Sequence, residues 1–175
     1  ATGEEAYSIA ILFAETFARL QRWPQLKIFA TDIEQEYLDH ASAGVYPEAI
    51  AAEVSPARLE RFFIHRAGSY AVRNELRANM IFARHNLIDA PPFTRMNLVS
   101  CRNMLIYLRP RAQEAAVSRL HYALAPDGVL FMGPSESLGA EHDDFATLSA
   151  RHKLYRMLRR GRTVVSGDGG ARPAP

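Results

Sequence analysis

Three short apolar segments of this chain each end in polar residues that could hold a small ligand. The polar residues are an acid, an amide and an arginine–asparagine pair: Asp32, Asn86, Arg102 and Asn103. A carboxylate or an amide oxygen accepts hydrogen bonds from hydroxyl and amino groups, and an arginine binds a carboxylate through paired hydrogen bonds. Polar groups that follow the strands of an open α/β sheet gather at its carboxyl edge, where such sheets bind ligands. The pattern therefore predicts a small-ligand site at that edge.

The elements that must position these residues alternate along the chain. Apolar residues at helical spacing predict helices, and short apolar runs bounded by turn residues predict buried strands. Helices are predicted at residues 4–20, 33–43, 47–54, 56–63 and 111–124, and strands at 26–30, 80–84, 97–101 and 129–132. This alternation predicts an α/β fold with a mostly parallel, doubly wound sheet.

Three features depart from simple alternation. Residues 64–72, with Ala67 and Gly68 between apolar flanks, predict an inserted β-hairpin, and 145–148 and 153–158 predict antiparallel edge strands. A turn is predicted at 126–128. The first helix opens on Thr-Gly-Glu-Glu, so a strand and a glycine-rich turn should precede it. We therefore expect the first strand to be missing from a chain that is a fragment of a longer protein.

The composition narrows the function classes. The chain has 175 residues, 48% of them apolar, which suits one domain with a substantial core. Lys and Arg number 21 against 19 Asp and Glu, and part of the excess lies in the tail, so nucleic acid is not an expected partner. No apolar stretch is long enough to span a bilayer. We expect a cytoplasmic protein without direct membrane insertion.

The single cysteine and the six histidines predict neither a nucleophile nor a metal site. Cys101 lies within an apolar strand, which would raise the pKa of its thiol, and no His or acid pattern suggests that it is activated. The histidines lack metal-ligand spacing. A single cysteine also excludes a disulfide framework and favours a reducing compartment.

Four ordered motifs resemble one protein family. They are TGEEAYSIA at residues 2–10, ATDI at 30–33, ARHNL at 83–87 and CRNMLIY at 101–107. With them, the chain resembles the CheR-type chemotaxis receptor methyltransferases, which use S-adenosylmethionine (SAM) to methylate glutamate side chains of chemoreceptors. The segments GPSES at 133–137 and HYAL at 121–124 look most like the versions fused to methylesterase and sensor-kinase modules.

The resemblance implies a domain plan and partners. Residues 1–158 would form a Rossmann-like SAM-dependent methyltransferase domain with a small β insertion at about 62–74, and residues 159–175 a linker or tail. The cofactor would be SAM and its product S-adenosylhomocysteine. The substrate would be the cytoplasmic helices of chemoreceptors. A non-catalytic signalling scaffold and a methyltransferase for another acceptor are the alternatives.

The resemblance also implies roles for individual residues. Asp32 would accept both ribose hydroxyls of the adenosine, unless it only caps the following helix. Glu4 or Glu5 would take the ammonium group of the methionine portion, unless both only interact with the helix dipole. Asn86 and Leu87 would contact the adenine, if Asn86 is not simply a loop residue. The implied cofactor-binding set is Thr2, Gly3, Glu4, Glu5, Asp32, Asn86, Leu87, Cys101, Arg102 and Asn103.

Two of the implied residues would act on the substrate. Arg102 would orient the acceptor carboxylate with paired hydrogen bonds, and Tyr107 would lie against the sulfonium or direct the nucleophile. The alternatives are an Arg in a surface ion pair and a Tyr in the core. Methyl transfer from a sulfonium to an ionised carboxylate needs no general base, and the motifs contain no obvious one.

Overall fold

The structure is a computed structural model that describes residues 2–159. These residues form two compact units, unit 1 up to Asn86 and unit 2 from Leu87 onward. The predicted linker lies, beyond Arg159, outside the described residues. Of the helices described, none combines the length and the apolar character needed to cross a membrane.

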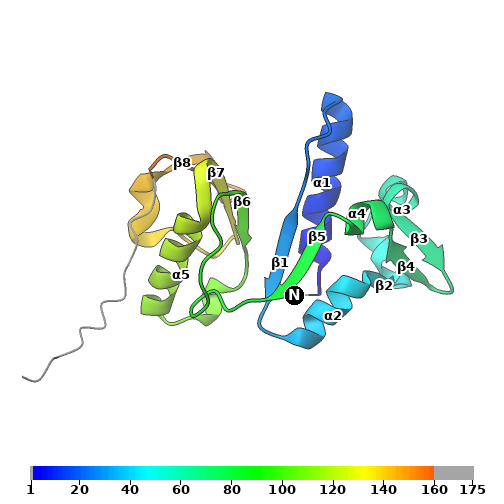
Figure 1. Cartoon of the computed structure of the whole chain (residues 1–175), viewed down its shortest axis with the longest axis horizontal. Helices are drawn as coiled ribbons and strands as arrows, with labels where there is room; N and C mark the ends of the chain where they lie inside the picture. Colours follow the sequence, from blue (N-terminus) through cyan, green and yellow to red (C-terminus); the bar gives the residue numbers. More distant parts are fainter. Residues whose placement is uncertain (1, 160–175) are drawn as a thin grey trace, which may run out of the picture. The chain divides into compact units, whose positions relative to one another are not determined.

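Unit 1 is built on one parallel pair of strands (Figure 1). Its elements in chain order are α1 (Glu4–Leu20), β1 (Ile28–Asp32), α2 (Gln35–Ala43), β2 (Val45–Pro47), the 3-10 helix η1 (Glu48–Ala52), α3 (Pro56–Phe62), β3 (Phe63–Arg66), β4 (Ser69–Val72), α4 (Asn74–Arg77) and β5 (Met80–Arg84). Strands β1 and β5 pair in parallel, with Ile28 opposite Met80 and Asp32 opposite Arg84. The parallel pairing confirms the predicted α/β character.

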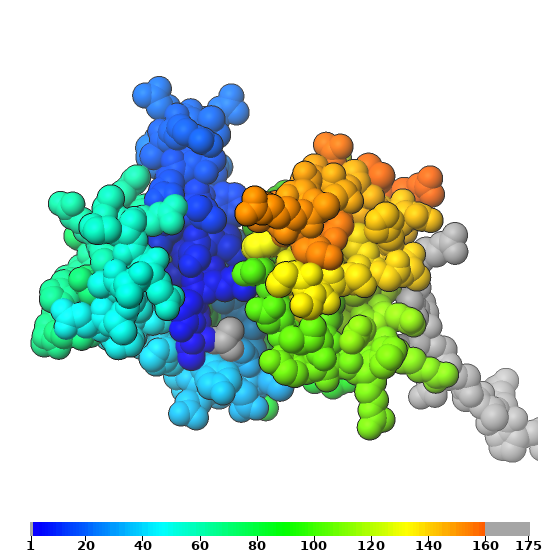
Figure 2. All heavy atoms as spheres, turned by 180° about the vertical axis from the view of Figure 1, so that it is seen from behind, coloured from blue at the N-terminus to red at the C-terminus, as the bar shows by residue number. Residues whose placement is uncertain are grey.

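Helix α1 follows its apolar spacing closely. It buries Tyr7, Ala10 and Ile11 in the core of unit 1 and ends where Gln21 adopts a left-handed conformation, with φ of 50°. The end of α1 stands clear of the cyan residues of unit 1 in the space-filling view (Figure 2). Leu20, at that end, is 57% exposed. The first half of α1 therefore supplies most of its packing.

The predicted hairpin is part of a three-stranded antiparallel sheet with the order β2-β4-β3. Ala67 and Gly68 form its two-residue turn, both with positive φ, at 43° and 76°, as a type I′ hairpin turn requires. The helix predicted at 47–54 is wrong at its start, because Pro47 ends β2 and only a 3-10 helix follows. A proline lacks the N–H that a central strand donates, and β2 lies at the sheet edge, where this loss is tolerated.

Unit 2 is a four-stranded mixed sheet with one long helix. Its elements are β6 (Met96–Cys101), the 3-10 helix η2 (Leu105–Tyr107), α5 (Pro110–Ala123), β7 (Leu124–Met132), the 3-10 helix η3 (Gly139–Asp144), β8 (Phe145–Ser149) and β9 (Leu154–Met157). The strand order is β6-β7-β9-β8. Strands β6 and β7 are parallel, and β9 is antiparallel to both of its neighbours, β7 and β8. Both predicted antiparallel strands are confirmed, but only β8 lies at the sheet edge, because β9 lies between β7 and β8.

The turn predicted at residues 126–128 is wrong. These residues lie inside β7, whose register against β6 shifts between Met96 and Leu98. Asp127 takes a φ of 60° there. The Pro-Asp-Gly sequence is thus an irregularity within one strand, because β7 pairs with β6 both before and after it.

The strand pairs match part of the doubly wound order. In the order 3-2-1-4-5-6, the second and third strands pair with each other, as do the fourth and fifth. Strands β1 and β5 correspond to the first of these pairs, and β6 and β7 to the second. No strand formed by residues 2–159 takes the first position.

Candidate functional site

The carboxyl ends of β1 and β5 bring two predicted site residues to one end of unit 1. The N–H of His85 donates to the carbonyl oxygen of Asp32 at 3.0 Å, which continues the strand pairing past Arg84. Asn86 is the next residue and is exposed. Helix α1 begins at this same end of unit 1 (Figure 1). The end therefore gathers the predicted acid, the predicted amide and the first turn of α1.

Asp32 shapes the turn between β1 and α2. Its Oδ1 accepts a hydrogen bond from the N–H of Glu34 at 3.0 Å, which is an Asx turn. Helix α2 begins at Gln35 with Glu34 at the cap position. The alternative that Asp32 is the N-cap is therefore wrong in position, although its carboxylate does help to start the helix. The side chain is partly buried.

The turn before α1 is held tightly against α2. Gly3 has a φ of 94°, and a Cβ at this position would lie 2.9 Å from both the Ala41 Cβ and the Tyr46 hydroxyl oxygen. The Tyr46 hydroxyl donates to the Thr2 carbonyl oxygen at 3.0 Å. Only glycine fits this combination of conformation and close approach. The backbone at Thr2 and Gly3 is thus fixed at the end of unit 1.

The predicted acids lie in the first turn of α1. Glu4 is exposed and accepts a hydrogen bond from the Thr2 hydroxyl at 2.6 Å, whereas Glu5 is partly buried. Burial is the main cause that raises the pKa of the Tyr46 hydroxyl, and the nearby Glu4 and Tyr7 raise it further. Tyr46 therefore stays protonated and keeps donating to Thr2 at physiological pH. Both acids also lie where the helix dipole favours negative charge.

Unit 2 contributes the predicted residues that follow β6. Cys101 is buried, 8% exposed, and lies opposite Met132 of β7. The Arg102 guanidinium lies over the Phe131 ring, 4.7 Å from its centroid. Such cation–π contacts restrain an arginine without using its hydrogen-bond donors.

The rest of that segment is more open. Asn103 is exposed and takes a left-handed φ of 57°. Tyr107 is 82% exposed at the end of η2, so the alternative of a core tyrosine is wrong. Leu87, by contrast, packs against the core of unit 2. Its apolar surface is thus at least partly used within the protein.

Glu136 was not predicted as a site residue. It is only 4% exposed, and its carboxylate accepts backbone hydrogen bonds from the segments that follow β6 and β7. A single glutamate in a Gly-Pro-Ser-Glu-Ser sequence carries no periodic signal. Its partners are backbone N–H groups, which every sequence has, so only the fold identifies it.

A further polar cluster in unit 2 contains the fully buried His121. His121 Nδ1 is hydrogen-bonded to Glu141, and Nε2 contacts the carbonyl oxygen of Arg159 at 2.6 Å. Asp144 lies close enough that the three side chains could approach one ion. A carbonyl oxygen only accepts, so Nε2 must donate to it. Both ring nitrogens thus tie α5 to η3 and to the chain after β9.

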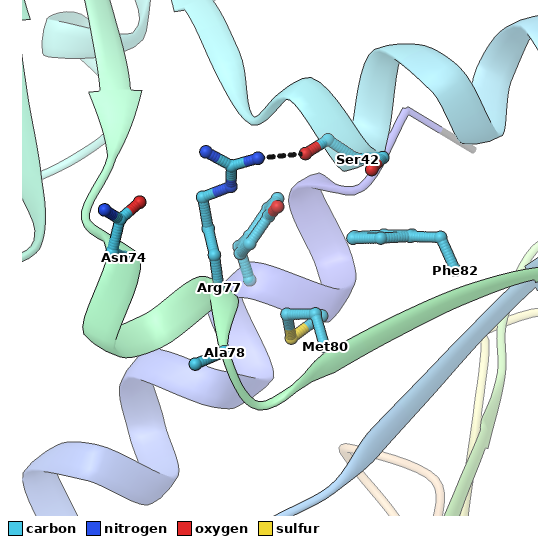
Figure 3. Close-up of a pocket in the computed structure, with 7 residues that line it drawn as sticks. Ser42, Asn74, Arg77, Ala78, Met80 and Phe82 are labelled. Atoms are coloured by element: carbon cyan, nitrogen blue, oxygen red, sulfur yellow. Dashed lines mark hydrogen bonds between the residues drawn. The ribbon is translucent and has the colours of Figure 1, made fainter.

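A pocket of about 350 Å³ lies beside α1 and α4 in unit 1 (Figure 3). Its lining residues are Tyr7, Ser42, Asn74, Arg77, Ala78, Met80 and Phe82. Arg77 donates to the Ser42 carbonyl oxygen at 2.8 Å and the Tyr7 hydroxyl to the Ala41 carbonyl oxygen at 2.9 Å. Burial raises the pKa of Tyr7 against the opposing effect of Arg77. The predicted site residues do not line this pocket.

Comparison with known proteins assigns the chain to a family. Residues 1–154 match the family described as CheR methyltransferase, SAM binding domain. The chain is 55% identical over 161 residues to an uncharacterized 104.1 kDa protein of Rhodobacter capsulatus. The match covers 92% of this chain and 17% of that protein. It is 36% identical over 173 residues to the chemotaxis protein methyltransferase of Escherichia coli (strain K12), covering 94% and 55%.

The same relationship holds for a second enterobacterial protein. The chain is 37% identical over 146 residues to the chemotaxis protein methyltransferase of Salmonella typhimurium, covering 78% of this chain and 49% of that protein. The chain thus spans about half, or less, of the length of these curated relatives.

Proposed function

The chain belongs to the CheR methyltransferase family through its SAM-binding domain, and we propose that the protein transfers methyl groups from SAM to glutamate side chains of chemoreceptors. The family match over residues 1–154 carries this proposal. The proposed catalytic domain is residues 1–158, with the β insertion inside it and a linker after it. The acceptors would be the cytoplasmic helices of chemoreceptors, which places the reaction in the cytoplasm. Fused methylesterase and sensor-kinase modules are the proposed neighbours in the longer protein.

The chemistry at the end of unit 1 suits the nucleoside and amino-acid parts of SAM. A ribose offers two hydroxyl donors, which the Asp32 carboxylate can accept. The methionine portion carries an ammonium group, for which Glu4 and Glu5 are candidate partners in the first turn of α1. The Gly3 backbone is held beside these acids by the close approach of Ala41 and Tyr46. These acceptors fit the hydroxyl and ammonium donors of the cofactor.

Further contacts are proposed for Thr2 and for the residues that follow β5 and β6. Asn86 presents an amide to the exocyclic nitrogen of the adenine, and Leu87 offers a partial apolar contact. Thr2 supports the turn around the methionine portion, and Cys101 and Asn103 line the cofactor beside β6. Arg102 pairs with the acceptor carboxylate, and Tyr107 directs that carboxylate toward the methyl group.

The proposed chemistry asks little of the side chains beyond positioning. SAM supplies a methyl group that is already activated on a sulfonium sulfur. An exposed glutamate is ionised at neutral pH, so the acceptor oxygen needs no base. Holding a nucleophile in line at short range can supply several kcal/mol of rate enhancement. Arg102 and Tyr107 are therefore assigned to orientation of the acceptor.

The test uses the whole protein that contains this domain. It is incubated with SAM carrying a labelled methyl group and a purified chemoreceptor cytoplasmic fragment, and base-labile label on receptor glutamates is mapped by mass spectrometry. The matched acceptor control has those glutamates replaced by glutamine. We expect label with the first receptor, either on its glutamates or released as methanol by the fused methylesterase, and none with the second. SAM binding without transfer would instead favour a non-catalytic signalling module.

A further inference from the structure

The Glu136 carboxylate joins the chain segments that follow β6 and β7. Its Oε1 accepts from the N–H groups of Met104 at 2.9 Å and Leu105 at 2.8 Å, and its Oε2 accepts from the N–H of Gly133 at 2.7 Å. The Glu136 N–H in turn donates to the Gly133 carbonyl oxygen at 3.1 Å. One side chain thereby fixes the backbone at three points in two segments.

The burial of this carboxylate makes its hydrogen bonds important for stability. Glu136 is 4% exposed, and a buried carboxylate is costly unless hydrogen bonds replace its water. Three backbone donors do so here, and hydrogen bonds to a charged acceptor are stronger than those between neutral groups. An apolar residue could fill the same space, but it would leave three donors without this acceptor.

The two segments also approach too closely for any side chain at residue 133. A Cβ on Gly133 would lie 2.7 Å from Glu136 Oε2 and 2.9 Å from both the backbone nitrogen and the Oδ1 of Asn103. Asn103 is therefore packed directly against the glycine that Glu136 holds. Moving either segment would disturb both Asn103 and the Glu136 hydrogen bonds.

The residues on either side of Asn103 are restrained as well. Arg102 lies over the ring of Phe131, two residues before Gly133, and Met104 donates to Glu136. The segment 102–107, which carries the proposed acceptor-orienting residues, is thus attached to β7 and its following turn at consecutive positions. Because its carboxylate accepts from backbone N–H groups, Glu136 is suited to holding that segment rather than to touching a substrate.

We propose that Glu136 is a positioning residue that sets the geometry of segment 102–107, and through it the orientation of the methyl acceptor. This inference rests on the proposed function for the roles of Arg102 and Tyr107, but the clamp itself is a property of unit 2. A misplacement of about 1 Å can reduce a rate about 100-fold. Loss of one clamp bond should therefore affect turnover more than cofactor affinity.

The informative variant is Glu136→Gln in the whole protein. Glutamine can keep an oxygen toward Met104 and Leu105, but its NH₂ group then faces the N–H of Gly133, donor against donor. We expect kcat with a receptor fragment to fall about 10- to 100-fold. The dissociation constant for S-adenosylhomocysteine should change much less. Gly133→Ala should also lower turnover, and because its methyl group would meet Asn103, which is assigned to the cofactor, it should weaken S-adenosylhomocysteine binding as well.

Val117→Ala is the matched control for stability. Val117 is 3% exposed in the same apolar core as Leu105, so its truncation creates a small cavity there but removes none of the Glu136 hydrogen bonds. Assays are compared at a temperature well below the melting points of all variants. If Glu136→Gln loses no more turnover than Val117→Ala, the positioning role is overturned.

Amide hydrogen exchange tests the clamp without relying on activity. In Glu136→Gln, exchange of the Gly133 N–H should accelerate more than that of the Met104 and Leu105 N–H groups, whereas Val117→Ala should show no such order. Unchanged exchange at all three positions would overturn the proposal. If the unaltered protein transfers no methyl group to the receptor, the proposed function fails, and the exchange data still decide whether Glu136 clamps the segment.

Discussion

The backbone N–H of His85 donates to the carbonyl oxygen of Asp32 at 3.0 Å, one residue beyond the last paired positions of β1 and β5. This bond carries the strand pairing into the loop, so Asn86 leaves the sheet next to the acid rather than at an arbitrary point. Two polar side chains separated by 54 positions in the sequence are thereby delivered to the same end of unit 1. Because Asp32 and Asn86 lie at the same end of unit 1, variants of either residue test the same proposed cofactor site.

Asp32→Asn should weaken cofactor binding while leaving the fold intact. The asparagine oxygen can still accept from the Glu34 N–H and keep the Asx turn, but the charge that strengthens bonds to two ribose hydroxyls is lost. Hydrogen bonds to charged groups contribute about 1.5–3 kcal/mol, so affinity for S-adenosylhomocysteine in calorimetry should fall about tenfold or more. Asp143→Asn, at a fully exposed acid, is the charge-matched control. Equal affinities in the two variants would remove Asp32 from the site.

Gly3→Ala should destabilise unit 1 and weaken cofactor binding together. The added methyl meets Ala41 and Tyr46 at 2.9 Å, and the φ of 94° is unfavourable for alanine. Gly68→Ala is the matched control, because Gly68 also has a positive φ, of 76°, but its nearest neighbour would be 3.8 Å away. Strained backbone alone costs roughly 1–3 kcal/mol, so Gly3→Ala should exceed the control in chemical denaturation. A smaller loss for Gly3→Ala would contradict this packing.

Arg102→Ala and Tyr107→Phe should reduce methylation of a receptor fragment more than cofactor binding. The expected reason is that both side chains orient the acceptor, so their loss removes interactions made during transfer. Steady-state rates and calorimetric affinities are compared for each variant. Tyr122→Phe, at the end of α5, serves as the control for a tyrosine hydroxyl outside segment 102–107. Equal losses in both assays would reassign Arg102 and Tyr107 to the cofactor.

The Glu15–Arg58 ion pair should make unit 1 less stable in acid. Arg58 Nε and Nη2 donate to the two Glu15 carboxylate oxygens, both at 2.8 Å. The Arg58 hydrogen bond is the leading cause that lowers the pKa of Glu15 from its ordinary 4.5, against a smaller effect of burial. The unfolded chain therefore takes up the proton first as the pH falls. The stabilisation is complete above pH 4.5 and is lost as the pH falls through the lower, folded-state pKa.

The stabilisation by the Glu15–Arg58 ion pair should be modest, because both side chains are partly exposed. Glu15→Gln should cost about 0.2–1 kcal/mol of unfolding free energy at pH 7, and the difference from the unaltered protein should shrink toward zero in acid. Urea denaturation across this pH range measures it. Glu53→Gln, at an exposed acid of the same unit, is the control. A difference that grows on acidification would show that the pair does not act as described.

Residues 1–175 alone should fold poorly and transfer no methyl group, whereas a chain of the length of the curated relatives should fold and methylate a receptor fragment. Among the described residues, β1 pairs only with β5 and β6 only with β7, and Phe29 of β1 is 41% exposed. Unpaired strand edges and exposed apolar faces favour aggregation. Light scattering, thermal melting and the receptor assay compare the two chains. A monomeric 1–175 chain that melts cooperatively and methylates receptor glutamates would defeat this prediction.

The sequence was most informative where local patterns decide the structure. The β3–β4 hairpin was predictable because Ala67 and Gly68 interrupt two apolar strands by two residues, a spacing that tight hairpin turns require. Strand β5 was predicted with its observed bounds, since Met80–Arg84 is bracketed by helix-ending and loop residues. In the hairpin the paired residues are also close in the sequence, whereas β5 pairs with the distant β1 and was predicted from its own apolar run alone.

Long-range pairing explains the failures. Strand β2 is only three residues long and exists because Val45–Pro47 pairs with β4, so its own residues give a weak signal and Pro47 suggested a helix start. The Pro-Asp-Gly segment was expected to turn, but pairing with β6 on both sides retains it in β7. Glu136 could not be predicted for the same reason, because only the tertiary structure brings its three backbone donors to the carboxylate.

The hairpin tip also makes the chain convenient to label at one chosen point. Ala67 is exposed, and the chain has a single native thiol, Cys101, which is 8% exposed within the core of unit 2. An Ala67→Cys variant would therefore present one reactive thiol to a maleimide dye, because modification follows thiolate access. A fluorophore there would report on the three-stranded sheet without removal of the native cysteine.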